Sequence, residues 1–222
     1  ALADGPPGVL DKALLLIDRK QPRWLMGWRD ITNATNQRTV ITTVFPKVGV
    51  GHTMPLMYPA GGARLAATCL AQLSSLTLDY IARLKIGGTH LTYTYLYQFA
   101  FLPPRIFTQA DFDFIVPRVI ELTYTSQLMR PWAEDLGHPG PPFGWDPDRR
   151  ARLRGELDSF IARKYGLSRE QLRYLLDPTD THGPDYPSET FRVLRERETA
   201  QFGEYRTQRL VLEAYDRLEG VG

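Results

Sequence analysis

The sequence predicts an α/β fold of the α+β kind, in which a small mixed sheet with helices is followed by a mainly helical C-terminal region. Three observations lead to this prediction. β-Branched and aromatic residues form short runs before Pro46, apolar residues recur at helical spacing from Ala63 onward, and charged amphipathic segments follow residue 108. With 222 residues the chain is long enough to bury a substantial core.

The first part of the chain carries the strand signals. Residues 1–9, rich in Gly and Pro, are expected to form a flexible leader. A short strand is predicted at residues 14–17, and a second at residues 24–31, in which Gly27 marks a bulge. Residues 39–45 are β-branched and aromatic, so they predict a third strand, which Pro46 stops.

Helical spacing begins at residue 63. Apolar residues mark one face of residues 63–85, and Gly87-Gly88 predicts the end of this helix. Residues 89–102 allow two interpretations. Strict alternation of apolar side chains over residues 91–101 favours a strand, whereas Thr89 could cap a short helix that precedes an extended segment at 99–102. We prefer the helix followed by the strand.

The second part of the chain is predicted to be mainly helical. The predicted helices are residues 108–129 with Pro117 starting a second section, 149–165, 168–176 behind the capping-box pattern Ser168–Gln171, and 189–218 with an interruption near Gly203. Long polar loops are predicted at 130–148 and 177–187. The domain organisation expected is a leader at 1–9, an α/β domain at 10–107, and a helical region at 108–222 that packs on it.

Composition excludes several classes of protein. A hydrophobic share of 43% and a charged share of 23% are typical of globular rather than disordered chains. Apolar runs fall short of the length that a membrane span needs, and the N-terminus lacks a signal-peptide pattern, so we expect a cytoplasmic protein with no membrane partner. The single cysteine, Cys69, is interpreted as a packing residue.

Charge is divided unevenly along the chain. Residues 1–108 hold 11 Lys and Arg against 5 Asp and Glu, whereas residues 109–222 hold 16 against 20. The net charge of +2 therefore conceals a basic half and an acidic half. This division suggests that the basic half faces a polyanion and that the acidic half supports it.

The sequence contains none of the motifs GxGxxG, GxxxxGK[ST], HExxH or CxxC, so it predicts no catalytic, cofactor-binding or metal-ligating residue. Instead, the basic half contains three polar loops, at residues 32–38, 47–53 and 86–90. Arg and Lys neutralise phosphates, and Asn and Arg make paired contacts to purine edges. The candidate DNA-binding residues are Arg29, Asn33, Asn36, Arg38, Lys47, His52, Lys85, Thr89 and His90.

The order of several segments resembles a known family. The segments are Trp28-Arg29-Asp30-Ile31-Thr32-Asn33-Ala34-Thr35-Asn36-Gln37-Arg38-Thr39, Gly49-Val50-Gly51, Asp79-Tyr80-Ile81-Ala82-Arg83-Leu84-Lys85-Ile86-Gly87-Gly88-Thr89-His90, Leu102-Pro103-Pro104 and Phe202-Gly203-Glu204-Tyr205-Arg206-Thr207. Together they are similar to the C-terminal part of adenine-specific (N6) DNA methyltransferases of type II restriction-modification and DISARM-like phage-defence systems. The resemblance covers residues 24–218.

The resemblance implies a target-recognition domain at 10–107 and double-stranded DNA as the partner. In that family an N-terminal domain binds S-adenosylmethionine and flips the adenine. Its Asn-Pro-Pro-[Tyr/Phe] motif does not occur here, so we expect a non-catalytic fragment whose methyltransferase domain, with its S-adenosylmethionine, belongs to a longer parent protein. The alternative is an interaction scaffold, in which the acidic helical half docks other defence-system subunits and the loops read no DNA.

Overall fold

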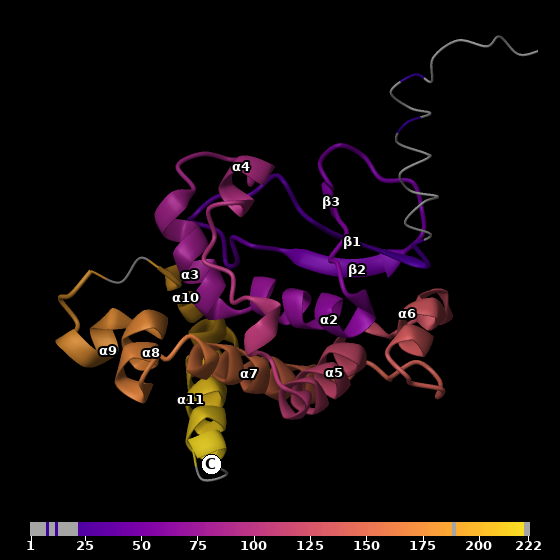
Figure 1. Cartoon of the computed structure of the whole chain (residues 1–222). Helices are drawn as coiled ribbons and strands as arrows, with labels where there is room; N and C mark the ends of the chain where they lie inside the picture. The colour runs from indigo at the N-terminus through magenta and orange to yellow at the C-terminus, as the bar shows by residue number, and fades with distance from the viewer. Residues whose placement is uncertain (1–7, 9–11, 13–21, 188–189, 220–222) are drawn as a thin grey trace, which may run out of the picture.

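A computed structural model describes residues 8, 12, 22–187 and 190–219 of the chain. The predicted leader and the predicted strand at residues 14–17 lie outside these residues, apart from Gly8. The α+β class is confirmed: a small sheet lies over a set of helices, and the C-terminal region is mostly helical (Figure 1).

The sheet has the order β2-β1-β3, and its strands are β1 (Trp24–Trp28), β2 (Thr42–Pro46) and β3 (Leu56–Met57). Both pairings are antiparallel, whereas a mixed sheet was predicted. β1 lies at the centre, which explains why four of its five residues are buried. Gly27 is not a bulge, because it pairs in regular register with Thr43 and Leu56. It is needed for close approach, since a Cβ there would lie 2.5 Å from the carbonyl oxygen of Pro55.

Helices make up most of the remaining described chain. They are α2 (Gly62–Leu73), α3 (Leu76–Lys85), α4 (Tyr93–Leu96), α5 (Gln109–Thr123), α6 (Arg130–Asp135), α7 (Pro147–Lys164), α8 (Arg169–Leu176), α9 (Pro178–His182), α10 (Arg192–Phe202) and α11 (Arg206–Glu219), with 3-10 turns at Pro104–Ile106 and Gln127–Met129. The capping box at Ser168 and the break at Gly203, which has a φ of 75°, are confirmed.

Four details differ from the prediction. The helix expected at 63–85 is broken between α2 and α3, where Ser75 accepts a hydrogen bond from the N–H of Leu78. Pro117 lies inside a continuous α5 and does not start a new section. α6 and α9 lie within segments predicted as loops. The segment at 99–102 has no strand partner among the described residues, although the short helix before it is present as α4.

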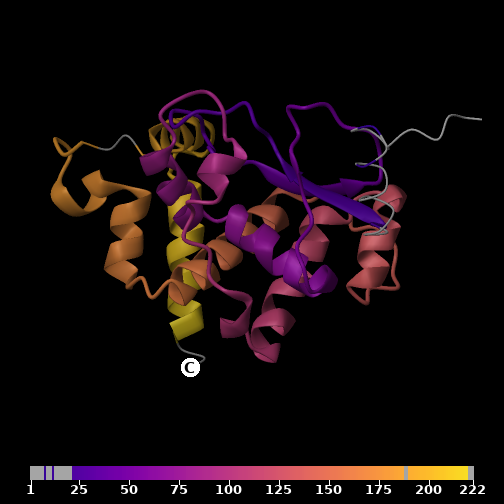
Figure 2. The ribbon, with the colours of Figure 1, turned by 45° about the horizontal axis from the view of Figure 1, so that its top comes forward.

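The helices form layers beneath the sheet. α2 lies between the sheet and a layer formed by α5 and α7, and α11 packs along α7 (Figures 1 and 2). One core cluster extends from Met26 and Trp28 of β1 to Leu157 and Ile161 of α7, and a second lies among α3, α8, α10 and α11. The predicted boundary at residues 107 and 108 therefore separates two parts of the chain that share a core.

Within the described chain, no single helix has the length and apolar character for crossing a membrane. α2 and α3 meet those criteria only when taken together, as a pair bent by 61°. Much of their apolar surface is in the core, with Ala66, Leu73 and Leu78 fully buried.

Candidate nucleic-acid interface

Asp30 joins two of the three polar loops. Its backbone N–H donates to the carbonyl of Thr53 at 3.0 Å, and its own carbonyl accepts from the N–H of Leu91 at 2.7 Å. Its carboxylate lies 2.7 Å from Nδ1 of His90. The loops at 47–53 and 86–90, far apart in sequence, therefore lie on either side of residues 29–32. We call residues 29–33, 47–53 and 85–90 the polar-turn face.

Of the first polar loop, residues 32–38, only Thr32 and Asn33 belong to the polar-turn face. The N–H of Thr32 donates to the carbonyl of Thr89 at 2.9 Å, and the Thr32 hydroxyl donates to the carbonyl of Thr39 at 2.7 Å. Oδ1 of Asn33 accepts from both the N–H and the hydroxyl of Thr35, at 2.9 and 2.7 Å. The amide of Asn36 donates to the Thr32 hydroxyl at 3.3 Å. Both asparagines thus close the turn with their side chains.

Residues 34–37 are held from α3. Arg83 donates to the carbonyls of Ala34, Asn36 and Gln37 at 2.7, 2.8 and 3.1 Å, and it also contacts the carbonyl of Thr190. This end of the first loop faces α3 and α10, away from the junction at Asp30. Sequence reasoning missed Arg83, although its spacing of four from Asp79 on a predicted helix is the pattern of an ion pair.

The nine candidate residues divide into two groups. Side chains that reach solvent are those of Arg29, Lys47, His52, Lys85, Thr89 and His90. The remaining three, Asn33, Asn36 and Arg38, are half-buried. Arg38 turns away from the polar-turn face: its guanidinium donates to the carbonyl of Ser74 at 3.4 Å and lies 3.6 Å from the carboxylate of Asp158. All six side chains of the first group are exposed, whereas Arg38 is directed toward Ser74 and Asp158.

Charge on the polar-turn face is one-sided. Between residues 22 and 108 the only carboxylates are Asp30 and Asp79. Their side chains are 14% and 1% exposed, and both are engaged, Asp30 with His90 and Asp79 with Arg83. By contrast, Arg29, Lys47 and Lys85 are exposed and form no ion pair with any residue that the structure describes. The face therefore presents cations without exposed carboxylates.

The acidic half is neutralised largely by its own arginines. Ion pairs within residues 109–222 include Glu156 with Arg118, Glu121 with Arg149, Asp111 with Lys164, Asp216 with Arg169, Asp180 with Arg173, Asp148 with Arg206, and Glu204 with Arg209. These pairs neutralise many acidic side chains of this half, while its surplus of carboxylates over cations remains.

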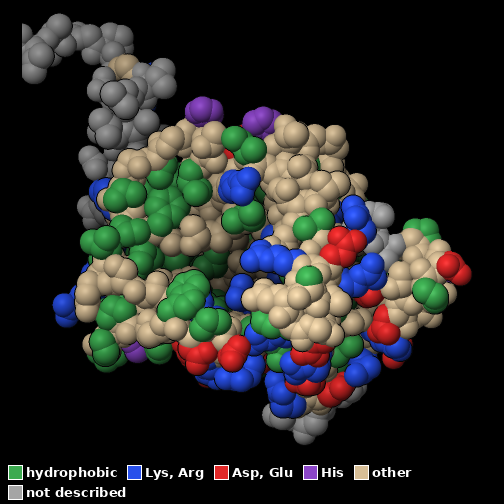
Figure 3. Space-filling view, turned by 180° about the vertical axis from the view of Figure 1, so that it is seen from behind, with side chains coloured by type: hydrophobic (Ala, Val, Ile, Leu, Met, Phe, Trp, Pro, Cys, Tyr) green, Lys and Arg blue, Asp and Glu red, His purple; other side chains and the backbone are tan. Residues whose placement is uncertain are grey.

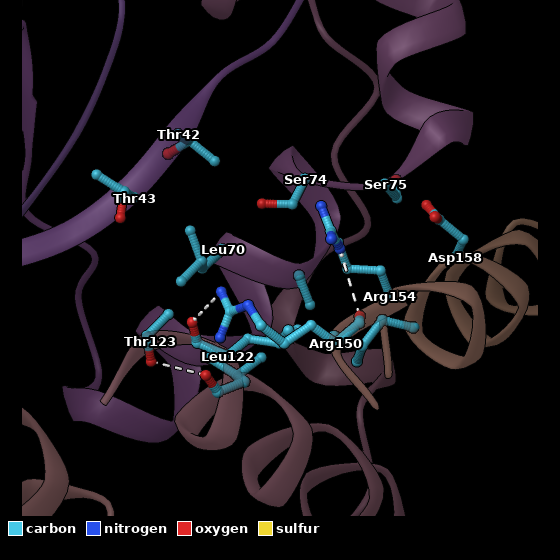
Figure 4. A pocket seen from close by; sticks show the side chains of 13 residues that line it. Thr42, Thr43, Leu70, Ser74, Ser75, Leu122, Thr123, Arg150, Arg154 and Asp158 are labelled. Carbon is cyan, nitrogen blue, oxygen red and sulfur yellow. Dashed lines mark hydrogen bonds between the residues drawn. The ribbon is translucent and has the colours of Figure 1, made fainter. Parts of the chain in front are cut away.

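A second cationic feature lies below β2. The surface seen in Figure 3 is hollowed near its middle, and Lys and Arg side chains gather beside the hollow. A pocket of about 230 Å³ lies between β2, α2, α5 and α7 (Figure 4), and we call it the arginine groove. Its polar lining residues are Thr42, Thr43, Ser74, Ser75, Thr123, Arg150, Arg154 and Asp158. A neighbouring hollow of about 430 Å³ shares Arg154 and Asp158 with it.

The arginine groove was not predicted from the sequence. The available signal was the spacing of Arg150 and Arg154, which places both on one face of the predicted helix at 149–165. Among the described residues, no group of three or more His, Cys, Asp or Glu side chains could hold a metal ion. Burial raises the pKa of the Cys69 thiol to about 11, so Cys69 stays protonated at neutral pH and suits the packing role predicted for it.

Comparison with protein-family models, with curated proteins and with solved structures finds no match to this chain.

Proposed function

We propose that this chain binds double-stranded DNA through the polar-turn face, as the target-recognition region of an adenine-N6 DNA methyltransferase of a restriction-modification or phage-defence system. The observation that carries the proposal is the junction at Asp30, which gathers residues from separate loops into one surface. The methyltransferase setting comes from the sequence resemblance. In that setting a separate domain binds S-adenosylmethionine, and the chain acts in the cytoplasm.

The charge of the face supports a phosphate-rich partner. Arg29, Lys47 and Lys85 are exposed, and the carboxylates of this part of the chain are turned inward. A duplex brought to such a surface releases counterions as its phosphates are neutralised, which makes binding strongly dependent on salt. We assign these three cations to phosphate contacts, which position the duplex without reading its sequence.

The side chains left for reading base edges are fewer than the sequence suggested. Oδ1 of Asn33 is used inside the first turn, and the Asn36 amide donates to Thr32. A paired contact to adenine needs both the oxygen and the nitrogen of an amide. We therefore place base reading on His52, Thr89 and His90, and we treat Asn33, Asn36 and Arg38 as residues that shape the loops.

The test is a titration of labelled duplex at several salt concentrations. The double variant Arg29→Gln/Lys85→Gln is compared with Arg130→Gln/Arg217→Gln, which removes the same charge from exposed sites on α6 and α11. The first variant should lower the slope of log Kobs against log salt by about 2, one unit for each lost phosphate contact. The control should keep the wild-type slope.

The same variants separate DNA binding from the scaffold alternative. If the chain serves only to dock other subunits, duplex binding is absent even at low salt, or both double variants weaken it equally. Partner binding by Arg29→Gln/Lys85→Gln should stay intact in either case, which shows that the variant is folded.

A further inference from the structure

We propose that the arginine groove is a second binding site, specific for a phosphate group, with Arg154 as its principal ligand and with Arg150 and Ser74 beside it. The groove is distinct from the polar-turn face, and the inference goes beyond DNA recognition by that face. It is carried by the surplus of cations in the groove, by unpartnered donors and by the geometry of the lining.

Cations in the groove outnumber the available carboxylates. Asp158 is the one carboxylate in its lining, and its side chain is 4% exposed. Asp158 is already engaged: Oδ1 accepts from the N–H of Leu76 at 2.6 Å, and Oδ2 lies 3.6 Å from Arg38. Arg154 forms no ion pair within the described chain, and its hydrogen bond runs from Nε to the carbonyl of Arg150 at 3.3 Å.

Arg150 adds donors that lack acceptors. Its Nη2 donates to the carbonyl of Leu122 at 2.8 Å, and Trp145 covers its guanidinium with a ring centroid 3.9 Å away. Nε and Nη1 are shielded from solvent, and neither donates a hydrogen bond to a residue that the structure describes. Charged donors held without acceptors are costly, and an anion that reached these two atoms would offset that cost.

Electrostatics point the same way. Desolvation and repulsion from Arg38 lower the pKa of the Arg154 guanidinium below its ordinary value, although Asp158 and Glu198 act in the opposite direction. Desolvation also lowers the pKa of Arg150, with Arg154 as the next contribution. These groups remain cationic at neutral pH, so the folded protein holds crowded positive charges that a bound anion would relieve.

The lining favours phosphate over a carboxylate. Figure 4 shows Arg150 and Arg154 reaching into the pocket from α7, with Ser74, Thr42 and Thr43 on the opposite side. The Ser74 hydroxyl makes no hydrogen bond with a described residue, so it can donate to a ligand. Two planar guanidinium groups and a hydroxyl match the several oxygens of a phosphate.

The experiment is a titration of the whole chain with inorganic phosphate, followed by tryptophan fluorescence, because Trp145 lies over Arg150. Arg154→Gln is compared with Arg152→Gln, a matched control on the same helix that does not line the groove. Saturable binding is expected for the wild type. Arg154→Gln should weaken it about tenfold or more, and Arg152→Gln should change it by less than about twofold. Equal effects of the two variants, or no saturation by about 10 mM phosphate, would overturn the proposal.

A thermal melt shows whether a loss of binding reflects loss of fold. Arg154→Gln breaks no ion pair within the described chain, so its Tm should stay close to that of the wild type, and phosphate should raise the Tm of the wild type but not of the variant. Competition identifies the source of the phosphate. Displacement of phosphate by a short duplex assigns the site to a nucleic-acid backbone, whereas displacement by adenosine monophosphate alone assigns it to a free phosphate-bearing ligand.

Discussion

Asp79 and Arg83, one turn apart on α3, form a buried ion pair in which Nε of Arg83 donates to Oδ2 of Asp79 at 2.8 Å. The other oxygen of Asp79 accepts from the backbone N–H groups of Thr39 and Val40 at 2.8 and 2.6 Å. Arg83 in turn donates to carbonyls of residues 34–37. This pair therefore holds residues 34–40, the later part of the first polar loop and the residues that follow it, against α3.

We predict that Asp79→Asn lowers the free energy of unfolding by about 3–5 kcal/mol, because it leaves Arg83 buried without its counter-charge. Chemical denaturation measures the change. Asp113→Asn is the control, since the exposed Asp113 side chain accepts, among the described residues, only from Gln109 one helical turn earlier. A loss at Asp79 as small as that at Asp113 would show that the pair does not hold the loop.

A second prediction concerns Gly27 at the centre of the sheet. Gly27→Ala places a methyl group 2.5 Å from the carbonyl oxygen of Pro55, so β1 and the segment before β3 must separate. We expect a loss of about 1–3 kcal/mol in unfolding free energy. At Gly49 a Cβ meets nothing within 4 Å, and Gly49→Ala should be close to neutral. Equal stability of the two variants in thermal and denaturant unfolding would contradict the close packing at Gly27.

A third prediction concerns pH. The hydrogen bond from Arg149 holds the pKa of Glu121 below its ordinary value of 4.5. A carboxylate with a lowered pKa stabilises the fold above that ordinary value, and its contribution disappears as the pH falls through the lowered pKa. Arg149→Gln should therefore cost stability at neutral pH and almost nothing in strong acid. Because the pair is partly exposed, the difference should be at most about 1 kcal/mol.

Measuring unfolding free energy of the wild type and Arg149→Gln from neutral pH to below pH 4.5 checks this. A gap between the two proteins that stays constant with pH would mean that Arg149 acts by packing alone. A gap that widens in acid would contradict the direction of the Glu121 shift.

The sequence predicted the start of α8 and the end of α10 correctly, because both depend on residues close together in the chain. Ser168 and Gln171 satisfy each other's backbone N–H groups at the start of α8, and this depends on residues three apart. α10 ends at Gly203, which adopts a φ of 75°, a left-handed conformation that glycine reaches without strain. The break between α2 and α3 is different. It is stabilised by Asp158, which accepts from the N–H of Leu76 across 82 positions of the chain, and a local pattern cannot show such a partner.

The candidate site shows the same limit. The sequence placed Asn33, Arg38 and His90 in polar loops. Asn33 and Arg38 lie in a loop, and His90 forms an isolated antiparallel bridge with Ile31. The sequence could not show that Arg38 points toward Asp158 while His90 pairs with Asp30, because those directions depend on tertiary packing. The arginine groove could not be predicted either, because tertiary packing brings its walls together from β2, α2, α5 and α7.

Hydrogen exchange of the whole chain, with and without a saturating duplex at low salt, tests most directly whether the polar-turn face binds DNA. We predict slower exchange at residues 29–33, 47–53 and 85–90, and little change along α8 and α11. Protection confined to α8–α11, or no protection at the three segments under conditions where the duplex is bound, would contradict the account.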